Sequence, residues 1–157
     1  MEKGPCETAK TQAGGCRSQQ SVPFSEFIHP LASSRQATPE VMSILLLTSD
    51  LACSSQVSAA GARTGSAVEV VMNPARLMER AVETSPDLVL LDLNTPLLDC
   101  GQVVGQLKAL ATPPKVIAFG PHVHEARLTA AQEAGCDRVL ARGQFYAQVD
   151  AILAQSR

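Results

Sequence analysis

Residues 88–96 read LVLLDLNTP, and this stretch decides the fold. Four apolar residues lead into one acid, Asp92, and a turn containing Asn, Thr and Pro follows at once. A run that is apolar at successive positions predicts a strand buried on both faces, as in a parallel sheet covered by helices above and below. In open α/β sheets, ligands and chemistry gather past the carboxyl ends of the strands. Asp92 is therefore the first candidate for a functional side chain.

The same alternation of short apolar runs and helix-length segments extends from Ser43 to the end of the chain. The predicted strands are Ile44–Leu47, Val68–Met72, Leu88–Leu91, Val116–Phe119 and Val139–Leu140. Five βα units predict an α/β fold with a five-stranded parallel sheet, the flavodoxin-like (βα)5 arrangement with strand order 2-1-3-4-5. Strands one and three are neighbours in this order, so Asp92 is expected where the winding of the sheet reverses.

Punctuating residues support the predicted helices. Asn73-Pro74 predicts the start of the second helix, because Asn caps helices and Pro suits the first helical position. Gly135 predicts the end of the fourth helix through a left-handed backbone conformation. The first helix is expected from Leu51 to about Gly61.

The chain divides into two parts by composition. Residues 1–41 are rich in Gly, Ser, Thr, Gln, Ala and Pro without sustained periodicity, which predicts a disordered N-terminal tail. Residues 42–157 are expected to form one globular domain. Met42-Ser43 stands directly before the first predicted strand, so a further hypothesis places the start of translation at Met42.

Composition excludes several classes of function. A net charge of -2 and only 3% aromatic residues argue against nucleic-acid binding, because neither a basic surface nor stacking platforms are available. No apolar run is long enough to span a membrane, and no apolar segment of a secretory signal stands at the N-terminus. Five cysteines without a C-x-x-C pair favour free thiols in a reducing compartment, so a cytoplasmic location is expected.

Two short motifs in the chain resemble those of a known family. Asp92–Asp99 reads DLNTPLLD and Ala134–Asp137 reads AGCD. Together with the five-unit rhythm, these segments resemble the receiver domain of two-component response regulators, and the likeness spans Ser43 to the C-terminus. The resemblance implies that Asp92 is the phospho-acceptor, that Mg²⁺ assists phosphoryl transfer, and that the partner is a signalling protein such as a histidine kinase or a regulator.

The chain departs from this family where the resemblance implies a metal site. The acidic pair at the end of the first strand is replaced by the neutral hydroxyls of Thr48 and Ser49, with Asp50 one residue later. Asp50 is therefore a weak metal-ligand candidate together with Asp92, because Mg²⁺ often relies on one or two carboxylates plus phosphate and water. The alternative is that Ser49 or Asp50 caps the first helix, and this alternative is favoured because Ser and Asp are preferred before a helix.

Two further positions depart from the family. The switch hydroxyl that the resemblance implies after the fourth strand is Gly120 here, and Thr95 in the predicted pocket does not replace it. The implied Lys after the fifth strand is Arg142, a planar cation capable of bidentate bonds rather than a compact ammonium. Arg142 is expected either to form a standing ion pair with Asp92 or to point into solvent, and the ion pair is favoured.

Other reactive side chains point to no separate site. His122 and His124 lack the further spaced ligands of a zinc site and are expected to be exposed in a loop. Cys100 at a predicted helix start is expected to be a packing thiol. No Gly-rich phosphate loop and no G-x-S-x-G motif is present.

The favoured interpretation is a stand-alone pseudo-receiver, not an enzyme and without a cofactor. It would act through protein contacts of the surface that spans His124 to Gln155, including Arg138 and Tyr146, with no output domain after Arg157. The first alternative is a phosphoryl-accepting receiver that uses Asp92, Asp50 and Mg²⁺. The second is a small-molecule-binding flavodoxin-like module whose pocket is widened at Gly120.

Overall fold

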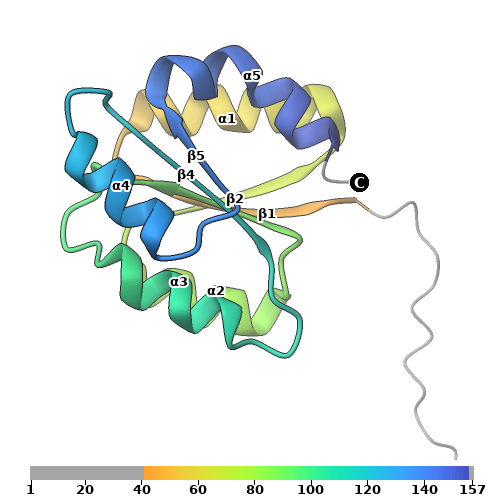
Figure 1. Ribbon diagram of the computed structural model, residues 1–157. Coiled ribbons are helices and arrows are strands. Elements are labelled where there is room, and N and C mark those ends of the chain that lie inside the picture. Colours follow the sequence, from red (N-terminus) through yellow and green to blue (C-terminus); the bar gives the residue numbers. More distant parts are fainter. Residues whose placement is uncertain (1–40, 156–157) are drawn as a thin grey trace, which may run out of the picture. The chain divides into compact units, whose positions relative to one another are not determined.

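The computed structural model describes residues 41–155, through which strands and helices alternate (Figure 1). The strands are β1 (Ser43–Leu47), β2 (Ala67–Val71), β3 (Leu88–Asp92), β4 (Lys115–Gly120) and β5 (Arg138–Ala141). The helices are α1 (Leu51–Thr64), α2 (Pro74–Thr84), α3 (Cys100–Lys108), α4 (Glu125–Glu133) and α5 (Arg142–Gln155). The predicted fold is thus confirmed, and no predicted strand differs from the observed one by more than a residue at either end.

The five strands form one parallel sheet of order β2-β1-β3-β4-β5, as the sequence predicts. β3 lies in the middle, between β1 and β4. Its last residue, Asp92, lies opposite Phe119 of β4. All five carboxyl ends meet at one edge, so residues that follow different strands are brought together there.

The helices cover both faces of the sheet (Figure 1). Alternate residues of each central strand serve the two faces. In β1, Ile44 and Leu46 pack under α1 and α5 with Phe145, whereas Leu45 and Leu47 pack with the buried side chains of α2 and α3. Because both faces are covered, every residue of β3 is buried. This explains why its sequence shows no polar alternation.

The predicted helix boundaries hold with one exception. Asn73 caps α2 by accepting a hydrogen bond from the amide of Arg76 at 2.7 Å. Gly135 follows α4 with a φ of 89°, the left-handed conformation that was predicted. Helix α1 is longer than expected, because it continues past Gly61 to Thr64 and ends at Gly65 with a φ of 72°.

The predicted disordered tail lies outside the described residues, apart from Val41. Met42 already belongs to the domain, since its side chain is buried in the core under α1 and α5. In the described part of the chain, no helix combines the length and the apolar character that crossing a membrane requires.

Candidate functional site

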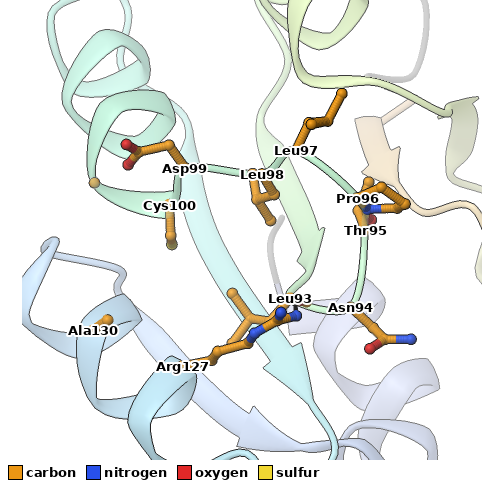
Figure 2. A pocket seen from close by; sticks show the side chains of 11 residues that line it. Leu93, Asn94, Thr95, Pro96, Leu97, Leu98, Asp99, Cys100, Arg127 and Ala130 are labelled. Atoms are coloured by element: carbon orange, nitrogen blue, oxygen red, sulfur yellow. Dashed lines mark hydrogen bonds between the residues drawn. The ribbon is translucent and has the colours of Figure 1, made fainter.

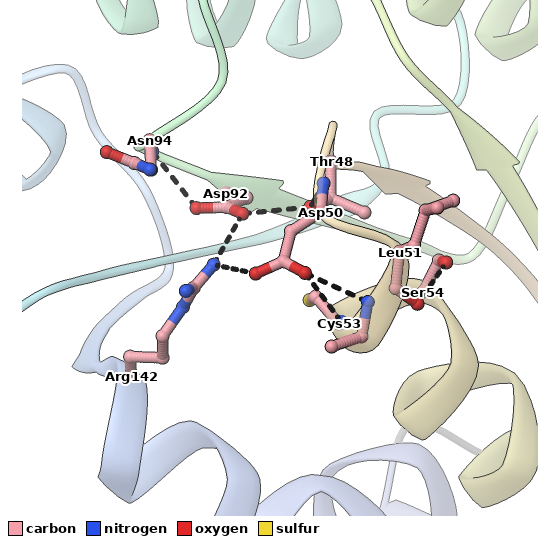
Figure 3. Close-up of polar contacts among 9 residues, drawn as sticks. Thr48, Asp50, Leu51, Cys53, Ser54, Asp92, Asn94 and Arg142 are labelled. Atoms are coloured by element: carbon pink, nitrogen blue, oxygen red, sulfur yellow. Dashed lines mark hydrogen bonds and ion pairs between the residues drawn. The ribbon is translucent and has the colours of Figure 1, made fainter.

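Asp92 ends β3 at the carboxyl edge of the sheet, and its side chain is only 2% exposed. Both carboxylate oxygens accept hydrogen bonds (Figure 3). Oδ2 accepts from the hydroxyl of Thr48 at 2.8 Å and from Nη2 of Arg142 at 3.0 Å. Oδ1 accepts from the backbone amide of Asn94 at 3.0 Å. The buried acid is therefore held by three donors that come from three different segments.

Arg142 is the first residue of α5, which follows β5 directly. The predicted pair with Asp92 is present. Its geometry differs from a bidentate fork, because the same Nη2 that bonds Asp92 also lies 3.1 Å from Oδ2 of Asp50. Burial opposes the charged form of Arg142, but the carboxylates of Asp92 and Asp50 outweigh it and raise the pKa of the guanidinium. One cation thus bridges two acids.

Asp50 caps α1, which confirms the favoured alternative from the sequence. Its Oδ1 accepts from the amides of Ala52 at 2.9 Å and Cys53 at 3.3 Å. These backbone bonds, with the charge of Arg142, lower the pKa of Asp50. One carboxylate oxygen therefore serves the helix and the other serves Arg142 (Figure 3).

Thr48 and Ser49 stand where the receiver resemblance implies an acidic pair, and the two hydroxyls differ in their environment. Thr48 is buried, donates its hydroxyl to Asp92, and accepts from the amide of Asp50 at 3.1 Å. Ser49 is exposed to solvent. The hydroxyl of Thr48 therefore belongs to the hydrogen-bond network of Asp92. The sequence predicts that β1 and β3 are neighbours, but it does not show that the hydroxyl of Thr48 points toward Asp92.

The pocket predicted around Gly120 is filled. Gly120 is buried, and a Cβ added there would lie 3.2 Å from Cβ of Leu93. Leu93 itself is buried directly after Asp92, and its amide donates to the carbonyl of Phe119 at 2.9 Å. The prediction that the missing side chain widens a cavity is therefore wrong, because a side chain from the neighbouring strand end takes that space.

A cleft lies farther along the β3–α3 loop, and Figure 2 shows its lining. Its volume is about 530 Å³, and it is bordered by residues 93–101 together with Arg127 and Ala130 of α4. Nη1 of Arg127 donates to the carbonyl of Leu93 at 2.8 Å and so ties α4 to the loop. Of the residues predicted to line a pocket, Thr95 alone borders this cleft. Its buried hydroxyl has no protein partner among the described residues. No sequence pattern pointed to Arg127.

His122 and His124 are both exposed in the loop before α4, as predicted. Among residues 41–155, no group of three or more His, Cys, Asp or Glu side chains is arranged to hold a metal ion.

The residues at the Asp92 site do not fit the Mg²⁺ that the family resemblance implies. Mg²⁺ requires oxygen ligands in near-octahedral geometry. Here the facing oxygens of Asp50 and Asp92 both bind Nη2 of Arg142, a donor that cannot ligate a metal and whose charge repels one. The position between the two carboxylates is taken by a side chain of the protein itself.

Comparisons with known proteins agree with this architecture. No protein-family model matches the chain. The transcriptional regulatory protein PrrA of Mycobacterium leprae is 31% identical over 94 residues, which cover 57% of this chain and 40% of that protein. The chain therefore matches less than half the length of this relative.

Solved receiver domains share the fold. The signal receiver domain of a response regulator from Bermanella marisrubri is 26% identical with a TM-score of 0.58, over 63% of this chain and 83% of that one. The receiver domain of the sensor histidine kinase PA1611 from Pseudomonas aeruginosa is 21% identical with a TM-score of 0.63, over 73% and 95%. That second structure has a magnesium ion coordinated in its active-site cleft.

Proposed function

We propose that this chain, a receiver-type domain of the response regulators of two-component signalling, transmits a signal through protein contacts and does not accept a phosphoryl group. The observation that carries the proposal is the state of Asp92. Its two oxygens accept three hydrogen bonds, and its side chain is 2% exposed. A buried carboxylate whose oxygens both accept hydrogen bonds is a poor nucleophile, because attack requires an accessible oxygen that can approach the phosphoryl donor.

The charge balance supports the same conclusion. Phosphoryl transfer depends on cations that neutralise charge on the transferred group. Arg142 is the cation at this site, and both nearby carboxylates already bind it. Because the guanidinium is part of the chain, its pairing with Asp50 and Asp92 needs neither metal nor phosphate. The proposal is that this internal cation holds one conformation permanently.

The proposed contact surface comprises α4, β5 and α5. On this surface Arg138 is exposed and donates to Oε1 of Gln148 at 3.1 Å. Tyr146 contributes less than the sequence suggests, because its ring is half-buried and lies against Phe145 at a centroid distance of 5.6 Å. A signalling protein such as a histidine kinase or another regulator is the proposed partner class, and the domain acts as a binding module, not as an enzyme.

The experiment is incubation with acetyl phosphate and Mg²⁺, followed by intact-mass measurement. We expect no added phosphoryl group on the wild-type chain, under conditions in which a control receiver with an intact acidic pair is modified. A triple variant that restores the family's residues, Thr48→Asp, Ser49→Asp and Arg142→Lys, is expected to gain one phosphoryl group. If the phosphoryl group is no longer gained when Asp92→Ala is added to the triple variant, Asp92 is identified as the acceptor.

The rival function, an aspartyl-phosphate carrier, predicts the opposite result for the wild-type chain. A stoichiometric gain of one phosphoryl group that disappears in Asp92→Ala would overturn the proposal. Arg138→Ala is the matched control for changes at Arg142, because Arg138 lies on the same strand–helix unit and makes no contact with Asp92. This variant is expected to behave as the wild type does in the phosphorylation experiment.

A further inference from the structure

Two cysteine side chains lie between α3 and α4, away from the carboxylates of the Asp92 site. Cys100 and Cys136 are both half-buried free thiols, and both pack against the core that α2, α3 and α4 share. Each thiol is the main influence on the pKa of the other, so the two side chains lie close together. Segments far apart in the sequence therefore bring together two groups that are capable of redox chemistry.

Cys100 occupies an activating position. It is the first residue of α3, directly after the N-cap Asp99, whose side chain accepts from the amide of Gln102 at 3.0 Å. The free amides and the dipole at a helix N-terminus favour a thiolate over a thiol. Cys100 also borders the cleft of the β3–α3 loop, so a small reagent reaches it from solvent (Figure 2).

The way α4 ends fixes the backbone at Cys136. The amide of Gly135 donates to the carbonyl of Gln132 at 3.0 Å, and the amide of Cys136 donates to that of Ala131 at 3.3 Å. With Gly135 in the left-handed conformation, these two bonds form a Schellman motif. In this motif the residue after the glycine folds back against the last turn of the helix. The side chain of Cys136 packs against the core that includes Ala131 of α4 and Val104 of α3.

The two thiols are not equivalent. The hydrogen bond from Cys136 lowers the pKa of Cys100, although burial and the charge of Asp99 work in the opposite direction. The same hydrogen bond and burial raise the pKa of Cys136. Because Cys100 also lies at the N-terminus of α3, it is the thiol better placed to ionise. This difference matches an attacking thiol beside a resolving thiol.

We infer that Cys100 and Cys136 form a peroxide-oxidisable pair that closes to an intramolecular disulfide. The Cys100 thiolate attacks one oxygen of hydrogen peroxide and becomes a sulfenic acid, and the other oxygen leaves and is protonated to water. The sulfur of Cys136 then attacks the sulfenic sulfur, loses its proton, and releases a second water as the S–S bond forms. Two thiols are oxidised, and one peroxide is reduced to two waters.

The consequence of this bond falls on α4. Ala131 is the one residue of α4 that is fully buried, whereas α3 buries Val103, Val104 and Leu107. A helix with so little buried surface opens easily. Lys108 already ties the end of α3 to Asp137 by a 3.1 Å ion pair, and a disulfide would fix the neighbouring residue covalently. Oxidation therefore clamps α4, which belongs to the proposed contact surface.

Cys53 provides an internal control. It belongs to α1, its side chain is fully buried, and burial raises the pKa of its thiol. A buried, protonated thiol reacts slowly with peroxide. Trypsin places the three cysteines of the described range in separate peptides, Cys53 in 36–63, Cys100 in 81–108 and Cys136 in 128–138.

The experiment uses the full chain with Cys6→Ser and Cys16→Ser, so that tail cysteines do not contribute. The protein is treated with hydrogen peroxide, quenched, alkylated after unfolding, and analysed by intact mass and tryptic mapping. We expect the loss of two hydrogen atoms, a linked pair of peptides 81–108 and 128–138, and alkylation at Cys53 alone. The disulfide should raise the Tm by about 10 °C relative to the reduced form.

Single variants test the two roles. In Cys136→Ala the resolving thiol is absent, so dimedone should trap a sulfenic acid on peptide 81–108. Cys100→Ala should give neither a dimedone adduct nor a disulfide. The inference is overturned if the parent chain forms no 81–108 to 128–138 link, or if Cys100→Ala still becomes oxidised at Cys136. The parent chain answers the first question without any variant of the pair, and none of these outcomes depends on whether Asp92 accepts phosphate.

Discussion

The β3–α3 loop carries a chemically capable side chain at each of its ends, and the two ends behave differently. At the strand end, Asp92 is buried and both oxygens accept hydrogen bonds from Thr48, Arg142 and Asn94. At the helix end, Cys100 is half-buried beside one weak donor, Cys136, and borders an open cleft. A buried acid whose two oxygens both accept hydrogen bonds is stabilised and poorly accessible, whereas an accessible thiol at a helix N-terminus is activated. Position at the edge of a parallel sheet does not by itself confer reactivity.

Removal of Arg142, the cation that Asp50 and Asp92 share, should give the largest change in stability. Arg142→Ala leaves Asp92 buried with two neutral donors and leaves Asp50 with its helix cap alone. Because breaking one side of a buried ion pair strands the other charge, we expect the free energy of unfolding to fall by about 3 kcal/mol. Urea unfolding at neutral pH measures this. Arg138→Ala, in which an exposed Arg is lost, should cost less than about 0.5 kcal/mol.

If Arg142→Ala lowers the free energy of unfolding by less than about 1 kcal/mol, the buried state of Asp92 does not depend on its cation. The contrast between Asp92 and Cys100 would then fail.

A side chain at position 120 should have the second-largest effect. Gly120→Ser places a Cβ about 3.2 Å from Cβ of Leu93, which is tighter than ordinary packing allows. Overpacking of this kind costs about 2 kcal/mol. Thermal or urea unfolding of Gly120→Ser checks this value. The double variant with Leu93→Ala should regain part of the loss relative to Leu93→Ala alone, because the smaller side chain makes room.

Equal losses from Gly120→Ser in both backgrounds would contradict the view that Leu93 fills the space beside Gly120.

The thiol pair should matter little for the stability of the reduced protein. Cys136→Ala removes a half-buried sulfur and one weak hydrogen bond, so we expect a change in the free energy of unfolding of less than about 1 kcal/mol. Urea unfolding in the presence of a reductant measures it. A loss comparable to that of Arg142→Ala would show that the thiols are structural, and the contrast between the two ends of the loop would disappear.

The smallest expected effect concerns pH. Asp50 has a lowered pKa in the folded state, so its contribution to stability is present above the pKa of an unfolded Asp and is lost as pH falls through the folded value. Asp50→Asn keeps a helix-capping side chain but does not titrate. We therefore expect this variant to lose less stability than the wild type between about pH 6 and about pH 3.

Urea midpoints across this pH range measure the difference. Asp150→Asn is the control. The side chain of Asp150 is 57% exposed and forms an ion pair with Arg63. If both variants reduce the pH dependence of stability equally, Asp50 contributes no more to the loss of stability in acid than an exposed carboxylate does.

Local chemistry made the fold and part of the site predictable. The apolar run at 88–91 and its four counterparts gave the strand order, since five alternating βα units leave few alternatives. Asn73, Asp50 and Gly135 were predictable as helix ends, because capping depends on a side chain and the backbone next to it. The pairing of Arg142 with Asp92 was also anticipated, since both follow strands at the same sheet edge.

The misses arose where a contact joined segments that are distant in the sequence. The space beside Gly120 was expected to be open, because the sequence does not show that Leu93 turns into it. The ties between Arg127 and Leu93, and between Cys100 and Cys136, likewise connect α4 or its end to the β3–α3 loop. Such contacts depend on how helices pack over the sheet, and no local pattern encodes them.

The sequence by itself determined the elements, their order in the sheet and the location of Asp92, because hydrophobic periodicity and capping act over a few neighbouring residues. The tertiary structure alone decided what surrounds these side chains. It joined Asp50, Asp92 and Arg142 into one network, filled the place beside Gly120 with Leu93, and set Cys100 against Cys136. Reactivity depends on burial, on satisfied hydrogen bonds and on neighbouring charge, and these are properties of packing.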